Sequence, residues 1–269
     1  MPQLTNNIED GSMVQLIFDA DRAKFAGIKT INVRPGKVLN THHGRVEHDD
    51  ILHAEFGDTL QTSKGVDFRI LRPTIAEATL SFPRGAAIIY PKDAAQIVQF
   101  GDIYAGQAVL ECGLGSGALT CNLLRAVGET GSVTSIERRD DFAKTAISNI
   151  DNFFGGHPEN WRLFEGEFSD FLSSNPEVFD RAILDMLDPW EYLEPLHAKL
   201  VRGAVIVIYL TTVPQILSVS KKFEELEDKY INIECTETIR RRWVLNELSI
   251  RPEHQGILHS GFILTARAV

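Results

Sequence analysis

The sequence predicts a doubly wound α/β domain built on a parallel sheet, preceded by a small β-rich domain. From residue 108 onward, short apolar runs alternate with amphipathic helical segments, which is the pattern of successive β-α-β units. The first 75 residues instead hold short β-rich runs separated by turn residues. We therefore expect a β-rich domain over residues 1–75, a connector over 76–107 and the α/β domain over 108–269.

The N-terminal segment is expected to form a small β-barrel. Its strand-like runs lie at residues 14–18, 29–33 and 66–71, and Asp-Ala-Asp, Pro-Gly and Lys-Gly turns separate such runs. The connector that follows contains Pro-Arg-Gly at 83–85 and Tyr-Pro-Lys-Asp at 90–93, and then a predicted helix near residues 94–100.

The first element of the α/β domain ends in a glycine-rich turn. Residues 108–112 read as a buried strand that carries Glu111, and Gly113, Gly115 and Gly117 follow it. Glycines let the backbone approach a ligand closely, and the helix predicted from residue 118 would direct its N-terminus at that ligand. A nucleotide-type cofactor is expected here.

Two cofactors fit the turn, because Gly113-x-Gly115-x-x-Ala118 also satisfies the loose dinucleotide fingerprint. Glu111 discriminates between them. A carboxylate at the strand end accepts a hydrogen bond from the ammonium of a methionine moiety, whereas it repels a pyrophosphate. S-adenosylmethionine therefore fits better than NAD.

Carboxylates also end the later strands. Glu137 ends a strand over 132–137, 20 residues after Gly117, the spacing at which an acid reaches a ribose diol. Glu167 follows a short strand, where it would meet the adenine amino group, and Asp185 ends a run over 179–185. Because parallel strands end at one edge of a sheet, a rim of carboxylates is expected there.

The C-terminal third continues this pattern and then changes it. We expect a buried strand over 205–210, a helix over 214–230 with apolar residues at helical spacing, and strand-like runs at 243–245 and 262–265. The last two runs are predicted to pair as an antiparallel hairpin at the edge of the sheet.

Composition argues against a membrane protein, a secreted protein and a metalloprotein. The chain has 269 residues, is 43% hydrophobic and lacks an apolar run near the ~18 residues that a membrane span needs. Its first residues have neither the basic start nor the apolar core of a signal peptide. Its three cysteines have no metal-ligand spacing, so a reducing cytoplasm is expected. Adjacent His42 and His43 would point to opposite faces of a strand, so we expect no metal.

Positive charge is concentrated in an otherwise acidic chain of net charge −10. The basic stripe, residues 22–46, holds six Lys and Arg residues and no Asp or Glu, and the arginine cluster is Arg240, Arg241 and Arg242. Such a run is either a solvated strand face or a surface that meets a polyanion. For the second alternative the candidate contacts are Lys24, Lys29, Lys37 and the arginine cluster.

Five segments together resemble the tRNA adenine-N1 methyltransferases that modify adenine 58 of the T-loop, most closely the bacterial and actinobacterial type. They are Thr-His-His-Gly at 41–44, Pro-Arg-Gly at 83–85, Ile-Tyr-Pro-Lys-Asp-Ala-Ala-Gln-Ile at 89–97, Glu-Cys-Gly-Leu-Gly-Ser-Gly-Ala-Leu-Thr at 111–120, and Leu-Asp-Met-Leu-Asp-Pro-Trp at 184–190. The glycine turn alone indicates only a class I methyltransferase, whereas the Tyr-Pro-Lys-Asp and Asp-x-x-Asp-Pro-Trp segments are more specific.

The resemblance implies a class I, Rossmann-like methyltransferase that uses S-adenosylmethionine and tRNA and assembles as a homotetramer. It implies that Asp185 meets the target base and that Tyr90 lies near the base pocket. The family carries Asp where this chain has Glu167, and the longer side chain could shift the cofactor adenine. The cofactor-binding residues implied by the turn and the resemblance together are Gln96, Glu111, Gly113, Leu114, Gly115, Ser116, Gly117, Glu137, Arg138, Glu167 and Asp185.

Two alternatives remain at the level of the sequence. A class I methyltransferase acting on a protein or a small molecule would leave the basic stripe as a solvated face, and tRNA-dependent methyl transfer separates the two. A catalytically silent RNA-binding subunit would show degraded glycines and no acid at the end of the fourth strand. This chain keeps both features. The sequence leaves open which tRNAs are used and whether neighbouring adenines are modified.

Overall fold

The computed structural model describes residues 6–18, 28–85, 87–246, 249–254 and 256–269. The chain divides into two compact units, and each is described by itself. The first comprises the described residues up to Phe82 together with Asp151–Gly156, and the second comprises Pro83–Ile150 and His157–Val269. The three-segment division drawn from the sequence stays a prediction beside this one.

The first unit is β-rich, as predicted. An antiparallel sheet has the strand order β2-β1-β6-β5, and β3 pairs with β4 in a separate hairpin. The described strands of this unit, for which a small β-barrel was predicted, thus form a four-stranded sheet and a two-stranded hairpin. The elements of this unit are β1 (Met13–Phe18), β2 (Ile28–Asn32), β3 (Val38–Thr41), β4 (Gly44–Glu47), α1 (His48–Leu52), β5 (Thr59–Gln61), β6 (Asp67–Leu71) and α2 (Ile75–Ser81).

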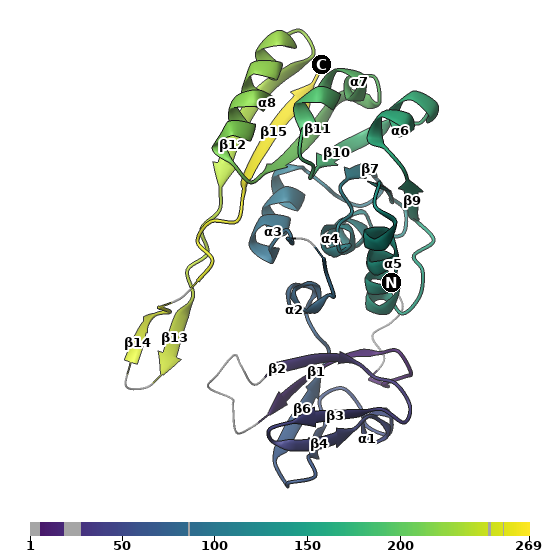
Figure 1. The fold of residues 1–269 in the computed structure, drawn as a ribbon, viewed down its shortest axis with the longest axis vertical. Coiled ribbons are helices and arrows are strands. Elements are labelled where there is room, and N and C mark those ends of the chain that lie inside the picture. The colour runs from purple at the N-terminus through teal and green to yellow at the C-terminus, as the bar shows by residue number, and fades with distance from the viewer. Residues whose placement is uncertain (1–5, 19–27, 86, 247–248, 255) are drawn as a thin grey trace. The chain divides into compact units, whose positions relative to one another are not determined.

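The second unit is the predicted doubly wound domain. Its sheet has the order β12-β15-β11-β10-β7-β8-β9, in which the five strands from β11 to β9 run parallel (Figure 1). Its strands are β7 (Ala108–Cys112), β8 (Ser132–Glu137), β9 (Trp161–Glu165), β10 (Phe179–Leu184), β11 (Leu200–Leu210), β12 (Tyr230–Glu237) and β15 (Phe262–Ala268). Its helices are α3 (Pro91–Phe100), α4 (Ala118–Val127), α5 (Asp140–Phe154), α6 (Phe168–Ser174), the 3-10 helix η3 (Pro189–Tyr192), α7 (Leu193–His197) and α8 (Val213–Glu225), except that the last turn of α5, from Asp151, is counted in the first unit.

The sequence accounts for the interior strand β11 and for the start of the helix α8 that follows it. β11 is buried along its last seven residues, which form the run Ala-Val-Ile-Val-Ile-Tyr-Leu from residue 204. α8 begins with a capping box, in which Thr212 accepts from the backbone of Gln215 and the Gln215 side chain bonds back, and it ends at Glu225, short of the predicted residue 230. Among the described residues, no helix has the length and apolar character of a membrane span.

The predicted C-terminal hairpin is wrong. The run at 243–245 lies in β13 (Trp243–Asn246), which pairs with β14 (Ser249–Pro252) in a separate two-stranded ribbon. The run at 262–265 belongs to β15, which lies inside the main sheet between β11 and β12. The largely buried β15 suits an interior position, whereas Trp243 and Leu245 in β13 and Ile250 in β14 are exposed. Figure 1 shows the β13–β14 ribbon extending well beyond the sheet.

Candidate active site

A pocket of about 500 Å³ opens at the carboxyl ends of the parallel strands, and all of its lining residues belong to the second unit. Three of the strand-end acids predicted from the sequence, Glu137, Glu167 and Asp185, meet here, because neighbouring parallel strands end at the same edge. The charged residues of its wall are Glu137, Arg138, Arg139, Glu167, Asp185, Asp188 and Glu191. Five carboxylates against two guanidinium groups make the pocket acidic.

The glycine turn packs directly against the strand that carries Asp185. Gly113 has φ 98°, and a Cβ at this position would lie 1.9 Å from the backbone oxygen of Asp185. The Asp185 amide donates to the carbonyl of Cys112 at 2.8 Å, and the Gly113 amide donates to the carbonyl of Ile136 at 3.1 Å. Only glycine fits at residue 113, and its backbone holds the ends of β7, β8 and β10 together.

The other turn residues occupy two kinds of position. Gly113 and Gly115 lie on the pocket wall. Leu114, Ser116 and Gly117 do not line it, and both Leu114 and Ser116 are buried. Gly117, at φ 78°, precedes α4 without a side-chain cap, so the first amides of α4 stay available at the turn. Cofactor contacts by these three residues stay predictions.

The Glu137 carboxylate is held by three donors. Oε2 accepts from the Gly115 amide at 3.2 Å, and Oε1 accepts from the Arg139 amide at 3.1 Å and from its Nε at 3.0 Å. The side chain is almost fully buried, although Glu137 reaches the pocket wall. Its orientation is therefore set before any ligand binds.

Glu167 and Arg138 form a weaker, exposed pair on the same wall. Arg138 Nη1 lies 3.9 Å from Glu167 Oε2, and more than half of each side chain is exposed. Such a pair contributes little to stability, so both side chains are available to a ligand.

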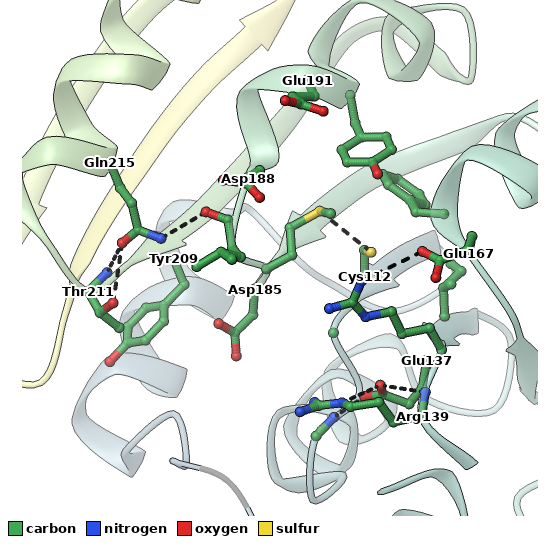
Figure 2. Close-up of a pocket in the computed structure, with 18 of the residues that line it drawn as sticks. Cys112, Glu137, Arg139, Glu167, Asp185, Asp188, Glu191, Tyr209, Thr211 and Gln215 are labelled. Carbon is green, nitrogen blue, oxygen red and sulfur yellow. Dashed lines mark hydrogen bonds and ion pairs between the residues drawn. The ribbon is translucent and has the colours of Figure 1, made fainter.

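Asp185 lies on the wall with an unusual protonation equilibrium. Burial raises the pKa of its carboxyl to about 7, the Arg139 charge acts to lower it, and the Glu137 charge raises it further. Figure 2 shows the carboxylate projecting between Tyr209 on one side and Glu137 with Arg139 on the other. A carboxyl that titrates near neutral pH inside a pocket is typical of a functional group.

Glu111 is not on the pocket wall. Its side chain is fully buried, and Oε2 accepts from Thr120 Oγ1 at 2.8 Å and from Ser135 Oγ at 2.6 Å. Burial raises the pKa of this carboxyl to about 7, and among the described residues Oε1 has no partner. The direct contact with a methionine ammonium stays a prediction, and the bonds seen here instead join β7 to α4 and β8.

Sequence reasoning missed Arg139, Tyr209 and Gln215, which also line the pocket. Gln215 Nε2 donates to the Leu187 carbonyl at 2.9 Å and thereby fastens the loop after Asp185 to α8 (Figure 2). The capping-box pattern Thr212-x-x-Gln215 was a readable signal for the helix start, but nothing in it predicts the contact with Leu187. Neither Tyr90, which precedes α3, nor Gln96 within it lines the pocket, so their roles stay predictions.

Comparison with known proteins identifies the family. The family model described as "tRNA methyltransferase complex GCD14 subunit" matches residues 68–260. The chain belongs to this family. The resemblance seen in the sequence is thereby confirmed.

Relatives and structural neighbours agree with this membership. The chain is 32% identical, over 87% of its length and 90% of the relative, to the tRNA (adenine(58)-N(1))-methyltransferase TrmI of Thermus thermophilus. Its fold matches the tRNA (m1A58) methyltransferase TrmI of Aquifex aeolicus with a TM-score of 0.81 and 28% identity, covering 98% of this chain and 99% of that one. A protein of Thermotoga maritima, described as an S-adenosylmethionine-dependent O-methyltransferase, matches with a TM-score of 0.87 and 28% identity, covering 98% and 95%. The predicted class I methyltransferase fold and S-adenosylmethionine as cofactor are confirmed.

The described members of the basic residues predicted to bind the substrate do not line the pocket. Lys29 in β2 and Lys37 are exposed on the first unit, and Lys24 falls outside the described residues. The arginine cluster lies between β12 and β13 on the second unit, where Arg242 Nη2 lies 3.5 Å from Glu253 Oε1. Within the described part of the chain, no group of three or more His, Cys, Asp and Glu residues is arranged to hold a metal ion.

Proposed function

We propose that this chain transfers the methyl group of S-adenosylmethionine to N1 of adenine 58 in the T-loop of tRNA. One observation carries the proposal. In a chain of the GCD14 family, the Asp185 backbone packs against the Gly113 turn while its carboxylate reaches the wall of an acidic pocket. That arrangement juxtaposes a cofactor turn and a residue able to meet the target base.

The pocket suits the cofactor. At Gly113 there is no room for a Cβ, so the backbone itself forms the wall, and Glu137 presents a pre-oriented carboxylate for the ribose hydroxyls. Glu167 and Arg138 are exposed on the same wall, at the position proposed for the adenine. When bound, S-adenosylmethionine supplies an electrophilic methyl group on a positively charged sulfur.

The chemistry requires positioning more than proton removal. Adenine N1 carries an in-plane lone pair at neutral pH, so the enzyme must extract the base and align N1 with the methyl group. As the methyl group transfers, positive charge grows on the ring and the exocyclic amine becomes a stronger donor. We assign Asp185 as the acceptor for that amine, because an ionised carboxylate there stabilises the transition state more than the ground state.

We further propose that the basic stripe and the arginine cluster dock the tRNA. The exposed Lys29 and Lys37 and the arginine cluster concentrate cations in a chain of net charge −10. Phosphate contacts of this kind supply affinity and orientation without reading sequence.

We also propose assembly as a homotetramer in the cytoplasm. The β13–β14 ribbon exposes Leu245 (82%) and Ile250 (68%), which face each other across the pair, and Trp243 (54%) lies on the same ribbon. Large apolar side chains grouped on a projecting ribbon favour burial against another protein surface. The family resemblance implies that this other surface belongs to a second copy of the chain.

Single-turnover methylation by an Asp185→Asn variant tests the proposed mechanism. The amide keeps the shape of the side chain but loses the charge, so the rate should fall by about two to three orders of magnitude, as for removal of one preorganised electrostatic partner. Cofactor and tRNA affinities should change much less. The rate of the wild-type enzyme should rise with pH through about 7, where Asp185 ionises, and the variant should lose this rise. A variant within a few-fold of wild type would remove Asp185 from the mechanism.

A further inference from the structure

Arg139 makes two directed contacts beside the pocket. Its Nε donates to Glu137 Oε1 at 3.0 Å, and its Cζ lies 3.6 Å from the centroid of the Phe142 ring. The same Glu137 oxygen accepts from the Arg139 backbone amide at 3.1 Å. A guanidinium stacked on a ring keeps its planar fork in one orientation, so the geometry toward Glu137 is fixed from both sides.

The Phe142 ring packs against the Pro-Arg-Gly segment. A Cβ at Gly85 would lie 3.3 Å from the ring, so the backbone of the Pro-Arg-Gly segment approaches it closely. Asn149 Nδ2 donates to the carbonyls of Pro83 (3.0 Å) and Ser116 (2.9 Å), which fastens this segment to the glycine turn. A glycine at residue 85 therefore has a packing reason, namely room for the ring that supports Arg139.

Arg139 is also the cation that acts on Asp185. Arg138 and Arg139 both lie on the pocket wall, and Arg138 pairs with Glu167. The positive charge of Arg139 instead lowers the pKa of Asp185, against the effect of burial. The other ionisable groups that interact with Asp185 come from three neighbouring strands: Glu111 and Cys112 on β7, Glu137 on β8 and Tyr209 on β11. All four are acids, so none of them offsets a loss of the arginine charge.

We propose that Arg139 is a positioning residue of the methyltransferase site. Stacked on Phe142, it fixes the Glu137 carboxylate for the cofactor, and its positive charge favours the ionised form of Asp185. This inference rests on the proposed function, because it assigns the ionised form of Asp185 to catalysis. Arg139 has no direct part in the methyl transfer.

The proposal predicts a pH effect with a definite sign. Removal of a positive charge raises the pKa of a nearby carboxyl, so an Arg139→Gln variant should need a higher pH to ionise Asp185. Because Arg139 is partly exposed, we expect a rise of about half a unit to one unit, below the one to three units of a close pair. With a starting pKa of about 7, a rise of one unit would lower the ionised fraction at pH 7 about fivefold.

Two variants separate the charge of Arg139 from its geometry. Arg139→Gln removes the charge and the stack, whereas Arg139→Lys keeps the charge and loses the planar fork. Single-turnover methylation of tRNA is measured from pH 5.5 to 8.5, and S-adenosylmethionine affinity is measured by calorimetry at each pH. Circular dichroism and thermal unfolding verify that each variant is folded.

In the glutamine variant, the midpoint of the pH profile should rise by about half a unit to one unit. In the lysine variant the midpoint should stay at the wild-type value, while cofactor affinity falls about three- to tenfold in both variants because Glu137 is less constrained. A midpoint that shifts equally in both variants, or in neither, would overturn the electrostatic role. Unchanged cofactor affinity in both would overturn the positioning role. Absence of tRNA methylation by the wild-type enzyme would instead refute the proposed function, and the affinity measurements would still decide the positioning role.

Discussion

Replacing Gly113 by alanine should disrupt both the sheet edge and the site. The new Cβ would lie 1.9 Å from the Asp185 oxygen, so that backbone must move by at least about 1 Å to reach an ordinary contact distance. The left-handed φ of 98° adds about 1–2 kcal/mol of strain for any residue with a Cβ. Loss of the bond from the Asp185 amide to Cys112, with a buried donor left unpaired, costs about 1–3 kcal/mol more. Together these two contributions should lower the free energy of unfolding by about 2–5 kcal/mol.

Gly115→Ala is the matched control in the same turn. Gly115 also has a left-handed φ, 56°, but nothing lies within 4 Å of the position where its Cβ would be. The free energy of unfolding of this variant should therefore fall by only about 1–2 kcal/mol, the cost of the backbone strain. Urea unfolding of both variants measures the difference, and single-turnover methylation by Gly113→Ala should fall about a hundredfold because Asp185 is displaced. Equal losses of stability in the two variants would refute the close-packing argument.

Three further predictions concern the cofactor, the tRNA and the assembly. Glu137→Gln should weaken S-adenosylmethionine binding by about 1.5–3 kcal/mol in calorimetry, whereas Glu165→Gln on the neighbouring exposed strand end should leave it unchanged. Neutralising Lys29 and Lys37 together should reduce the slope of log affinity for tRNA against log salt by up to about 2, and an unchanged slope would mark the stripe as a solvated face. Leu245→Asp places a charge on the apolar ribbon, so sedimentation should detect smaller species than the wild-type tetramer; a wild-type monomer would contradict the assembly proposal.

The centre of the fold and much of the pocket were predictable because local pattern and topology agree there. A parallel sheet brings all of its strand ends to one edge, so Glu137, Glu167 and Asp185 could be placed together from strand assignments alone. The glycine turn was equally readable, since positive φ and close approach both require glycine.

The remaining features depend on contacts between segments far apart in the chain. β15 was assigned to a hairpin with β13 because both are short apolar runs, and only tertiary pairing shows that β15 belongs between β11 and β12. Glu111 occupies the expected strand end, but the side chains of Thr120 and Ser135 turn its carboxylate into the interior. The stacking of Arg139 likewise depends on the space left at Gly85, which no pattern in the sequence specifies.

The most direct test of the proposed function is to map the methyl group on the tRNA. Purified protein is incubated with isotopically labelled S-adenosylmethionine and unmodified tRNA, and the modified nucleotide is identified by digestion and mass spectrometry, with an adenine-58-to-uridine transcript as the control substrate. The proposed function predicts 1-methyladenine at position 58 and loss of that label in the uridine transcript. Methylation of a protein or a small molecule in place of tRNA, or of tRNA at a nucleotide other than adenine 58, would contradict it.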